Sequence, residues 1–303
     1  MTIKYFILVI YRRLRKLRHL RQTLTQIIIG ILAKNDKFTE YFYLNRRSLL
    51  SKTILESTLN EAAKINQSEL YLQVKKGPFS GLIYSICKSE WYDDSTSLVQ
   101  KMYGLYEQEI LNYISSHRWS TLIDMGAGTG YYSFGMLKAG LCTKSVLFES
   151  DKTINQKIPK MANINNISSD RYIIHNSANE SEIMLYLDSL AETSKVLIIC
   201  DIEGYENVLF NLKFLKKLSE KNVTLIIEIH KHKFYKYQSK ENFLVDLSNT
   251  FIVKPLHSMK RNLDNTLDTF NLITDRWLFA SENRGEGVQL VAFTNHNKEK
   301  LAL

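Results

Sequence analysis

The feature that most constrains the fold lies at residues 121–130, where an apolar run leads to Asp124 and then to three glycines at alternate positions. A short apolar run closed by glycines is typical of a buried parallel strand that enters a tight turn. Residues 131–138 have the pattern of a helix, with Gly140 as its stop signal. Strand, glycine turn and helix together form the first unit of a doubly wound α/β sheet.

The glycine spacing distinguishes between two kinds of ligand. A dinucleotide-binding turn, Gly-x-Gly-x-x-Gly, requires a third glycine at position 131, but Tyr131 is there and Gly130 comes one residue earlier. The observed order, Asp-x-Gly-x-Gly-x-Gly, resembles motif I of the class I S-adenosylmethionine (SAM) methyltransferases. A single glycine motif also occurs as a purely structural turn. The residues at the other strand ends are therefore needed to decide whether this turn binds a ligand.

Composition and cysteine use indicate an ordinary globular protein in a reducing setting. The apolar fraction is 45%, the charged fraction is 23%, and three prolines in 303 residues argue against long disordered linkers. Cys87, Cys142 and Cys200 are far apart, which excludes a disulfide framework and a zinc spacing. Cys142 and Cys200 sit in or near apolar runs, so we expect buried free thiols and a cytoplasmic location.

Charge is concentrated at the N-terminus. Residues 1–35 hold eight basic residues and no acid, so the remaining chain contributes only +1 of the net charge of +9. A nearly neutral body does not support a broad nucleic-acid footprint. The two apolar runs of this segment are shorter than the ~20 residues that span a bilayer. Two interpretations of residues 1–35 stay open: a peripheral membrane contact, or a solvated basic helix that packs on the body or mediates oligomerisation.

The chain divides into three parts: the N-terminal segment 1–35, an extension or lid over 36–95, and a catalytic domain over 96–303. In the extension we expect a helix over 47–67, a hairpin of strands at 69–74 and 82–86, and a polar loop over 91–97. A long helix over 98–116 then leads into the sheet. In that sheet we expect strands at 121–125, 145–149, 171–175, 196–200 and 223–229, and helices at 131–139, 152–163, 205–219 and 239–249.

This alternation predicts a Rossmann-like, doubly wound, mostly parallel sheet with right-handed crossovers. Two late strands, 277–280 and 288–293, are joined by a polar turn and predict a C-terminal antiparallel hairpin. A SAM methyltransferase sheet has such a hairpin, and a plain dinucleotide domain lacks it.

Ligands of open parallel sheets bind beyond the carboxyl ends of the strands. At the second strand end, Glu149 follows Gly130 by 19 residues, about where an acid that holds ribose hydroxyls is expected. Asp151 is a weaker candidate for the same role. The alternative for Glu149 is that it is simply a solvated acid at a strand end. The third strand ends His175-Asn176-Ser177, which is either structural or hydrogen-bonds an adenine edge.

The fourth strand ends in Asp201-Ile-Glu203-Gly-Tyr-Glu206. Carboxylates at this strand mouth accept the proton of an attacking hydroxyl, orient an acceptor or bind a divalent cation; the alternative is that they cap the next helix. Glu206 begins that helix, where an acid suits the dipole, so we expect it to be structural. On the fifth strand, Glu228 and His230 point the same way. Both face the acceptor, unless His230 belongs to a basic surface over 231–236.

The combination resembles the FkbM-type methyltransferases over residues 120–295. The resemblance rests on Asp124–Gly130 with Glu149, on the 201–206 motif, and on Glu228-x-His230 with a late Glu-Asn-Arg turn at 282–284. A weaker match covers Gly77–Gly81 and Gly104–Glu107. Cys200 is a departure, because the family more often has isoleucine there.

The resemblance implies a SAM methyltransferase fold and O-methylation of sugars or polyketides. It implies a cofactor site made by Asp124, Gly126, Gly128, Gly130 and Glu149. We add Ala127, Asn176 and Asp201 as further candidate cofactor contacts, because they lie in the glycine turn or at strand ends. It implies an acceptor site made by Asp201, Glu203, Glu228 and His230.

We therefore expect an O-methyltransferase that acts on a sugar or glycolipid in bacterial surface-glycan assembly, with SAM as cofactor and no nucleic acid as partner. A divalent cation at Asp201 and the oligomeric state remain open. The alternatives are an RNA methyltransferase and a non-catalytic scaffold that keeps the fold. A dehydrogenase is disfavoured by Tyr131 and by the late hairpin.

Overall fold

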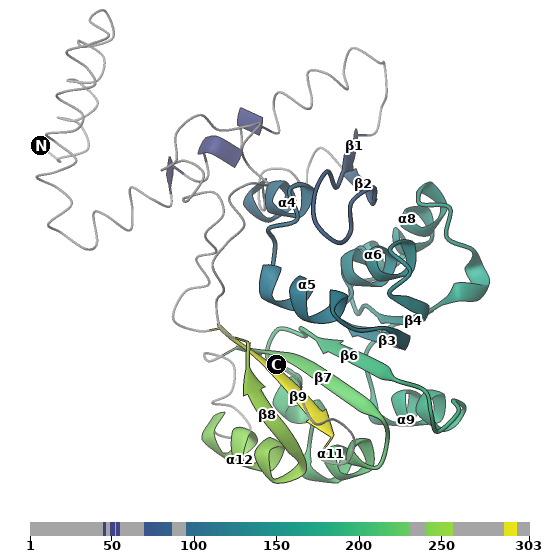
Figure 1. Cartoon of the computed structure of the whole chain (residues 1–303), viewed down its shortest axis with the longest axis vertical. Helices are drawn as coiled ribbons and strands as arrows, with labels where there is room; N and C mark the ends of the chain where they lie inside the picture. Colours follow the sequence, from purple (N-terminus) through teal and green to yellow (C-terminus); the bar gives the residue numbers. More distant parts are fainter. Residues whose placement is uncertain are drawn as a thin grey trace, which may run out of the picture.

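The computed structural model (Figure 1) describes residues 45–46, 49–51, 53–54, 70–86, 95–230, 240–256 and 288–295. The predicted segment 1–35 and most of the predicted helix 47–67 lie outside these residues. No helix within the described ranges is long and apolar enough to cross a bilayer. Cys142 and Cys200 are buried and free, as predicted, whereas Cys87 is not among the described residues.

The predicted fold class is confirmed. A seven-stranded sheet has the order β5-β4-β3-β6-β7-β9-β8. Its strands are β3 (Trp119–Met125), β4 (Cys142–Phe148), β5 (Tyr172–His175), β6 (Val196–Cys200), β7 (Val223–His230), β8 (Phe251–Pro255) and β9 (Val288–Asn295). The five strands from β5 to β7 run parallel, and β9 is antiparallel to both β7 and β8.

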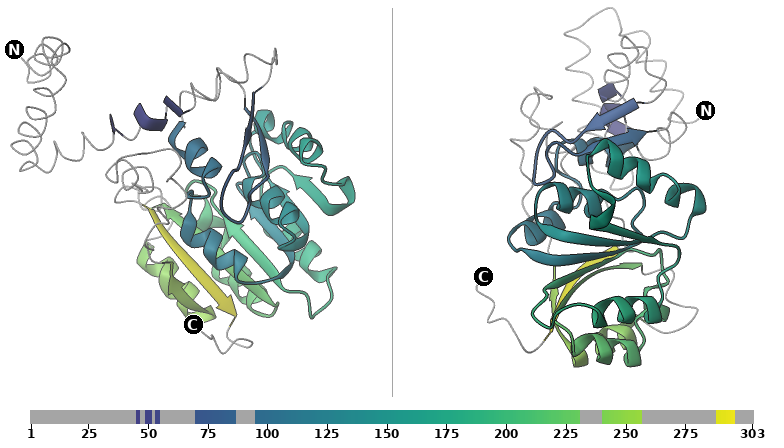
Figure 2. Two further views of the ribbon diagram at one scale, coloured as in Figure 1. Left: turned by 45° about the horizontal axis from the view of Figure 1, so that its top comes forward. Right: turned by 90° about the vertical axis from the view of Figure 1, so that its right-hand side faces the viewer.

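Helices cover both faces of this sheet, which Figure 2 (right) shows nearly edge-on between two helical layers. Adjacent strand residues belong to opposite cores: Leu122 packs in one core and Ile123 in the other. The first core is shared with helices α4 (Ser95–Met102), α5 (Gln108–Ser115), α6 (Tyr131–Lys138) and α8 (Ile158–Ile164). The second is shared with α9 (Glu180–Asp188), α10 (Glu206–Leu209), α11 (Leu212–Ser219) and α12 (Lys240–Thr250). The short α7 (Lys152–Asn155) and the 3₁₀ turn η3 (Ser169–Arg171) lie between β4 and β5.

The predicted N-terminal hairpin is present and packs on the sheet domain. Strands β1 (Leu70–Gln73) and β2 (Ile83–Ile86) pair antiparallel, and their turn places Phe79 against Gly135 of α6. A Cβ on Gly135 would lie 2.3 Å from the Phe79 ring, so glycine is what admits that ring. The Asn165 side chain bonds both the N–H and the C=O of Ile83, each at 2.8 Å. The hairpin therefore shares one core with the sheet domain.

The prediction of one helix over 98–116 was wrong. Two helices, α4 and α5, occupy this region. The chain turns between α4 and α5 at Gly104, which has φ +64° and whose added Cβ would lie 2.5 Å from the Lys76 carbonyl oxygen. The Lys75 N–H also donates to the Met102 carbonyl at 2.6 Å. Tertiary contact with the hairpin turn, rather than local propensity, ends the first helix.

Other boundaries differ from the predictions as well. The helices expected over 152–163 and 205–219 are each divided in two, and α9 was not predicted. The antiparallel edge is confirmed for β9, but its described outer partner is β8. The expected arm 277–280 and the turn at 282–284 lie outside the described residues. Strand β8 escaped prediction because α12 runs directly into it, with no turn residue to mark the change.

Candidate active site

The strand register brings the predicted site residues to one edge of the sheet. The last residues of β3, β4, β5 and β6, namely Met125, Phe148, His175 and Cys200, pair in a single row with Ile227 of β7, which continues to His230. The residues that come next along the chain are therefore Gly126, Glu149, Asn176 and Asp201 after the first four strands, and Glu228 within β7. Sequence reasoning placed these side by side through the general rule for strand ends, and the register agrees with it.

The glycine turn is shaped by close backbone contacts. Gly126, Gly128 and Gly130 all have positive φ, at +78°, +54° and +88°. A Cβ on Gly126 would lie 1.7 Å from the Asp201 carbonyl oxygen, so no other residue fits there. The N–H groups of Gly126 and Ala127 donate to the Phe148 carbonyl at 2.9 and 3.0 Å. A Cβ on Gly128 would meet nothing within 4 Å, which leaves that backbone open to a ligand.

Glu149 faces a groove of about 700 Å³ at the carboxyl ends of β4 and β5. Its carboxylate is mostly buried and accepts the N–H groups of Gly128 and Asp151, both at 2.8 Å. Each carboxylate oxygen retains a lone pair for a ligand hydroxyl. Asn176 lines the same groove.

The neighbours of Glu149 and Asn176 have structural contacts. Asp151 accepts the N–H groups of Thr153 and Ile154 and caps α7, and these bonds lower the pKa of its carboxyl. His175 stacks on Phe148 with ring centroids 4.8 Å apart and lies 3.5 Å from a Glu182 oxygen. These contacts favour Glu149 over Asp151 as a ligand for hydroxyls.

Asp124 lies behind the glycine turn and is 2% exposed. It accepts a hydrogen bond from the Ser133 hydroxyl at 2.7 Å, and Ser145 donates in turn to Ser133 at 2.8 Å. Burial raises the pKa of Asp124 to about 7, against the opposing effect of the Ser133 bonds. The carboxyl is thus poised to ionise when a positive charge arrives.

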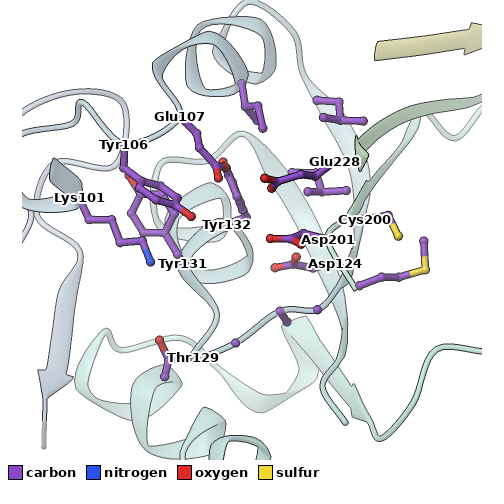
Figure 3. A pocket seen from close by; sticks show the side chains of 17 residues that line it. Lys101, Tyr106, Glu107, Asp124, Thr129, Tyr131, Tyr132, Cys200, Asp201 and Glu228 are labelled. Atoms are coloured by element: carbon purple, nitrogen blue, oxygen red, sulfur yellow. The ribbon is translucent and has the colours of Figure 1, made fainter. Parts of the chain in front are cut away.

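A second, smaller cavity of about 120 Å³ adjoins the glycine turn. In Figure 3 the carboxyl groups of Glu107, Asp124, Asp201 and Glu228 lie toward one another across it. Glu107 has φ +47° and accepts a hydrogen bond from the Tyr132 hydroxyl. Sequence reasoning had not assigned Glu107 to the site, because nothing local marks a residue of a preceding turn as a neighbour of strand ends.

The other wall of this cavity is aromatic. The Lys101 ammonium lies 4.4 Å from the Tyr106 ring centroid and 5.3 Å from that of Tyr131. Lys101 is the one basic side chain among the described residues that line the cavity, against four carboxyl groups. The cavity is therefore acidic and suits a cationic or hydroxyl-bearing ligand. Gly126 and Asp201 line both this cavity and the larger groove, so the two adjoin at these residues.

His230 is surrounded by carboxylates. Its Nδ1 lies 3.3 Å from Glu206 Oε1, and its Nε2 lies 3.6 Å from Asp201 Oδ1 and 3.8 Å from Glu203 Oε2. The hydrogen bond to Glu206 raises the pKa of His230. Burial and the charge of Glu107 raise the pKa of Asp201 to about 6, although His230 opposes the shift. Glu228 and His230 are both half-buried and alternate with the buried Ile227 and Ile229, which fits the expected shared face of β7.

Two residues of the 201–206 motif behave unlike ordinary helix caps. Glu203 has φ +55° and a side chain that is 71% exposed. Glu206 is completely buried, and its Oε1 accepts the Ile202 N–H at 3.0 Å while facing His230. The structural role expected for Glu206 accounts for the hydrogen bond from the Ile202 N–H only. The position of Glu206 at a helix start does not predict its contact with His230.

Comparison with known proteins adds a likeness of fold. No family model matches the sequence, and no curated protein matches it. An rRNA methylase from Streptococcus thermophilus is 12% identical, with a TM-score of 0.39, over 63% of this chain and 95% of that one. The YcgJ protein from Bacillus subtilis is 8% identical, with a TM-score of 0.40, over 62% and 98%. TYW2 from P. horikoshii, in complex with MeSAdo, is 14% identical, with a TM-score of 0.36, over 70% and 67%. Likenesses this distant say nothing about the reaction.

Proposed function

We propose that the chain is a SAM-dependent methyltransferase. The observation that carries the proposal is that Gly126 and Asp201 adjoin both the groove of Glu149 and the small acidic cavity. The adenosine of SAM fits the groove, with its ribose hydroxyls at Glu149 and its adenine edge at Asn176. The methionine part passes the open backbone of Gly128. Its ammonium and sulfonium charges then face the carboxyl groups of the cavity.

The reaction we propose is an in-line displacement at the Asp201 side of the cavity. An acceptor hydroxyl oxygen attacks the methyl carbon, the carbon–sulfur bond breaks, and its electron pair stays on sulfur to give S-adenosylhomocysteine. The hydroxyl proton passes to Asp201, whose pKa is raised to about 6, or to His230 in its neutral form. Alignment of the two reactants supplies much of the acceleration. A divalent cation at Asp201 is the alternative activator of the hydroxyl.

The acidity of the cavity favours a sugar hydroxyl as acceptor. Carboxylates accept hydrogen bonds from hydroxyls and repel phosphates. An RNA backbone is therefore a poorer match for the carboxyl groups of this cavity than a neutral sugar or glycolipid. This agrees with the FkbM-type resemblance and with surface-glycan assembly, in which residues 1–35 would hold a cytoplasmic enzyme at the membrane.

The acceptor class is tested by transfer of a labelled methyl group from SAM. We expect incorporation into neutral sugars, nucleotide sugars or glycolipids and none into total RNA. The product should be stable to base, because an ether is formed. Incorporation into RNA alone would overturn the sugar proposal and leave methyl transfer standing.

We expect Glu149→Gln to weaken SAM binding by about 10- to 100-fold, because hydrogen bonds to a charged group are worth about 1.5–3 kcal/mol. The amide also presents an NH₂ group where the carboxylate accepts two N–H groups. The measurement is a calorimetric titration. Asp151→Asn is the matched control, since asparagine caps a helix as well as aspartate does. Equal SAM affinity in the two variants would contradict the role of Glu149.

Binding of SAM should release protons near pH 7. Asp124 has a pKa of about 7 in the free protein, so part of its population is protonated there. A cationic ligand favours the carboxylate and lowers that pKa, so protons leave as SAM binds. Calorimetry in two buffers of different ionisation enthalpy measures this release. In Asp124→Asn the component centred near pH 7 should vanish, and its persistence would show that another group supplies it.

A further inference from the structure

Three side chains with metal-ligand chemistry converge beside the acceptor cavity. Asp201 follows β6, Glu206 begins α10, and His230 ends β7. One ligand atom from each lies within 4.8 Å of the other two. They come from three separate elements, so the sheet register and the turn after β6 bring them together. An oxygen, oxygen and nitrogen donor set of this kind is common around divalent cations.

The cluster has an excess of buried negative charge. Glu206 is 0% exposed, and its Oε2 has no hydrogen-bond partner. Asp201 Oδ1 is also buried without a hydrogen-bond partner and lies 3.6 Å from His230 Nε2. Within the described residues, the ion pairs of Asp201 and Glu206 are both made with the same cationic group, His230. One imidazolium cannot neutralise both carboxylates, and Glu203 adds a further charge at 3.8 Å.

Buried charges are normally paired or bound to a metal. We propose that Asp201, Glu206 and His230 bind one divalent cation. The two orphaned oxygens supply the anionic ligands, and His230 supplies a nitrogen once the cation displaces its proton. Imidazole together with carboxylates favours a transition-metal ion such as Mn²⁺ or Zn²⁺ over Ca²⁺. Three protein ligands leave coordination positions open for water or a substrate oxygen.

The role of the cation rests on the proposed function, whereas its binding rests on the geometry alone. Asp201 lines both the groove and the small cavity, so the open positions face the place where the acceptor hydroxyl must lie. A cation there makes the hydroxyl more acidic. The carbon–oxygen bond still forms as the carbon–sulfur bond breaks. The hydroxyl proton then passes to the exposed carboxylate of Glu203 and on to water, since Asp201 and His230 serve as ligands.

Electron paramagnetic resonance with Mn²⁺ alone tests the binding, because bound Mn²⁺ loses the signal of the aquo ion. We expect the full-length protein to bind one Mn²⁺ saturably. Asp201→Asn and His230→Gln should each weaken binding at least about 10-fold, as the loss of outer-shell partners alone already costs 10- to 100-fold. His175→Gln is the matched control, because His175 also lies beside a glutamate, Glu182, but away from the cluster. It should bind as the wild type does.

Absence of saturable binding, or equal binding by all four proteins, would overturn the cation site. Glu206→Gln tests the buried ligand through stability: Mn²⁺ should raise the Tm of the wild type and leave that of the variant unchanged. An equal rise in both would exclude Glu206 as a ligand. If the protein binds SAM but not Mn²⁺, the cation site is overturned and the proposed function stands. If it binds Mn²⁺ but not SAM, the proposed function is overturned and the cation site stands.

Discussion

Asp201→Asn is expected to lower kcat by about 10²- to 10⁴-fold, the range for loss of a general base, while SAM still binds. Asp201 is the one carboxylate that lines both cavities and also faces His230, at 3.6 Å, within the described part of the chain. The amide keeps the size of the side chain but neither accepts a proton nor carries the charge that a cation requires. The contacts that we propose for the cofactor at Glu149 and Gly128 remain in place.

The variant is compared with the wild type by methyl transfer at saturating SAM and by calorimetric titration of SAM. Asp188→Asn is a suitable control, because Asp188 is an exposed acid paired with Lys221 at 2.7 Å, outside both cavities. It should keep full activity. Full activity in Asp201→Asn would remove Asp201 from the mechanism, and loss of SAM binding would assign it to the cofactor site instead.

Gly126→Ala is expected to abolish SAM binding and to destabilise the fold strongly. Its Cβ would lie 1.7 Å from the Asp201 carbonyl oxygen, a backbone atom that cannot move without shifting the end of β6. Left-handed backbone at alanine costs about 1–2 kcal/mol. Overpacking adds about 1–3 kcal/mol or more, so the free energy of unfolding should fall by several kcal/mol.

Gly140→Ala separates these two effects. Gly140 also has positive φ, +66°, but a Cβ there would meet nothing within 4 Å. It should show the left-handed cost alone and bind SAM normally. Urea denaturation of the two variants measures the difference. Equal stability losses would mean that the turn after β3 relaxes freely around Asp201 and does not fix the cofactor loop.

The sequence alone predicted the parallel strands well, because each is a short, largely apolar run with a glycine turn or polar residues at its carboxyl end. The row from Gly126 to Glu228 at the sheet edge follows from that pattern and from the parallel order. Helix ends were harder to predict, because tertiary contacts set them: the break at Gly104 depends on the hairpin turn at Lys76. Strand β8 follows α12 without a break in the sequence.

The candidate site residues were predicted only where they lie at the carboxyl ends of strands or directly after them. Glu107 reaches the acidic cavity from the turn between α4 and α5, which no local pattern links to the sheet edge. Glu206 has the sequence signature of a helix-start acid, and its contact with His230 arises from the packing of α10 against β7. Residue spacing does not predict contacts between elements that are distant in the sequence.

The most direct test of the proposed function is calorimetric titration of the purified protein with SAM and, separately, with NAD. The glycine spacing, Glu149 and the acidic cavity predict saturable SAM binding and no NAD binding. Binding of NAD without SAM would contradict the account and indicate a dehydrogenase site. Binding of neither would contradict it as well and favour a scaffold that keeps the fold without the cofactor.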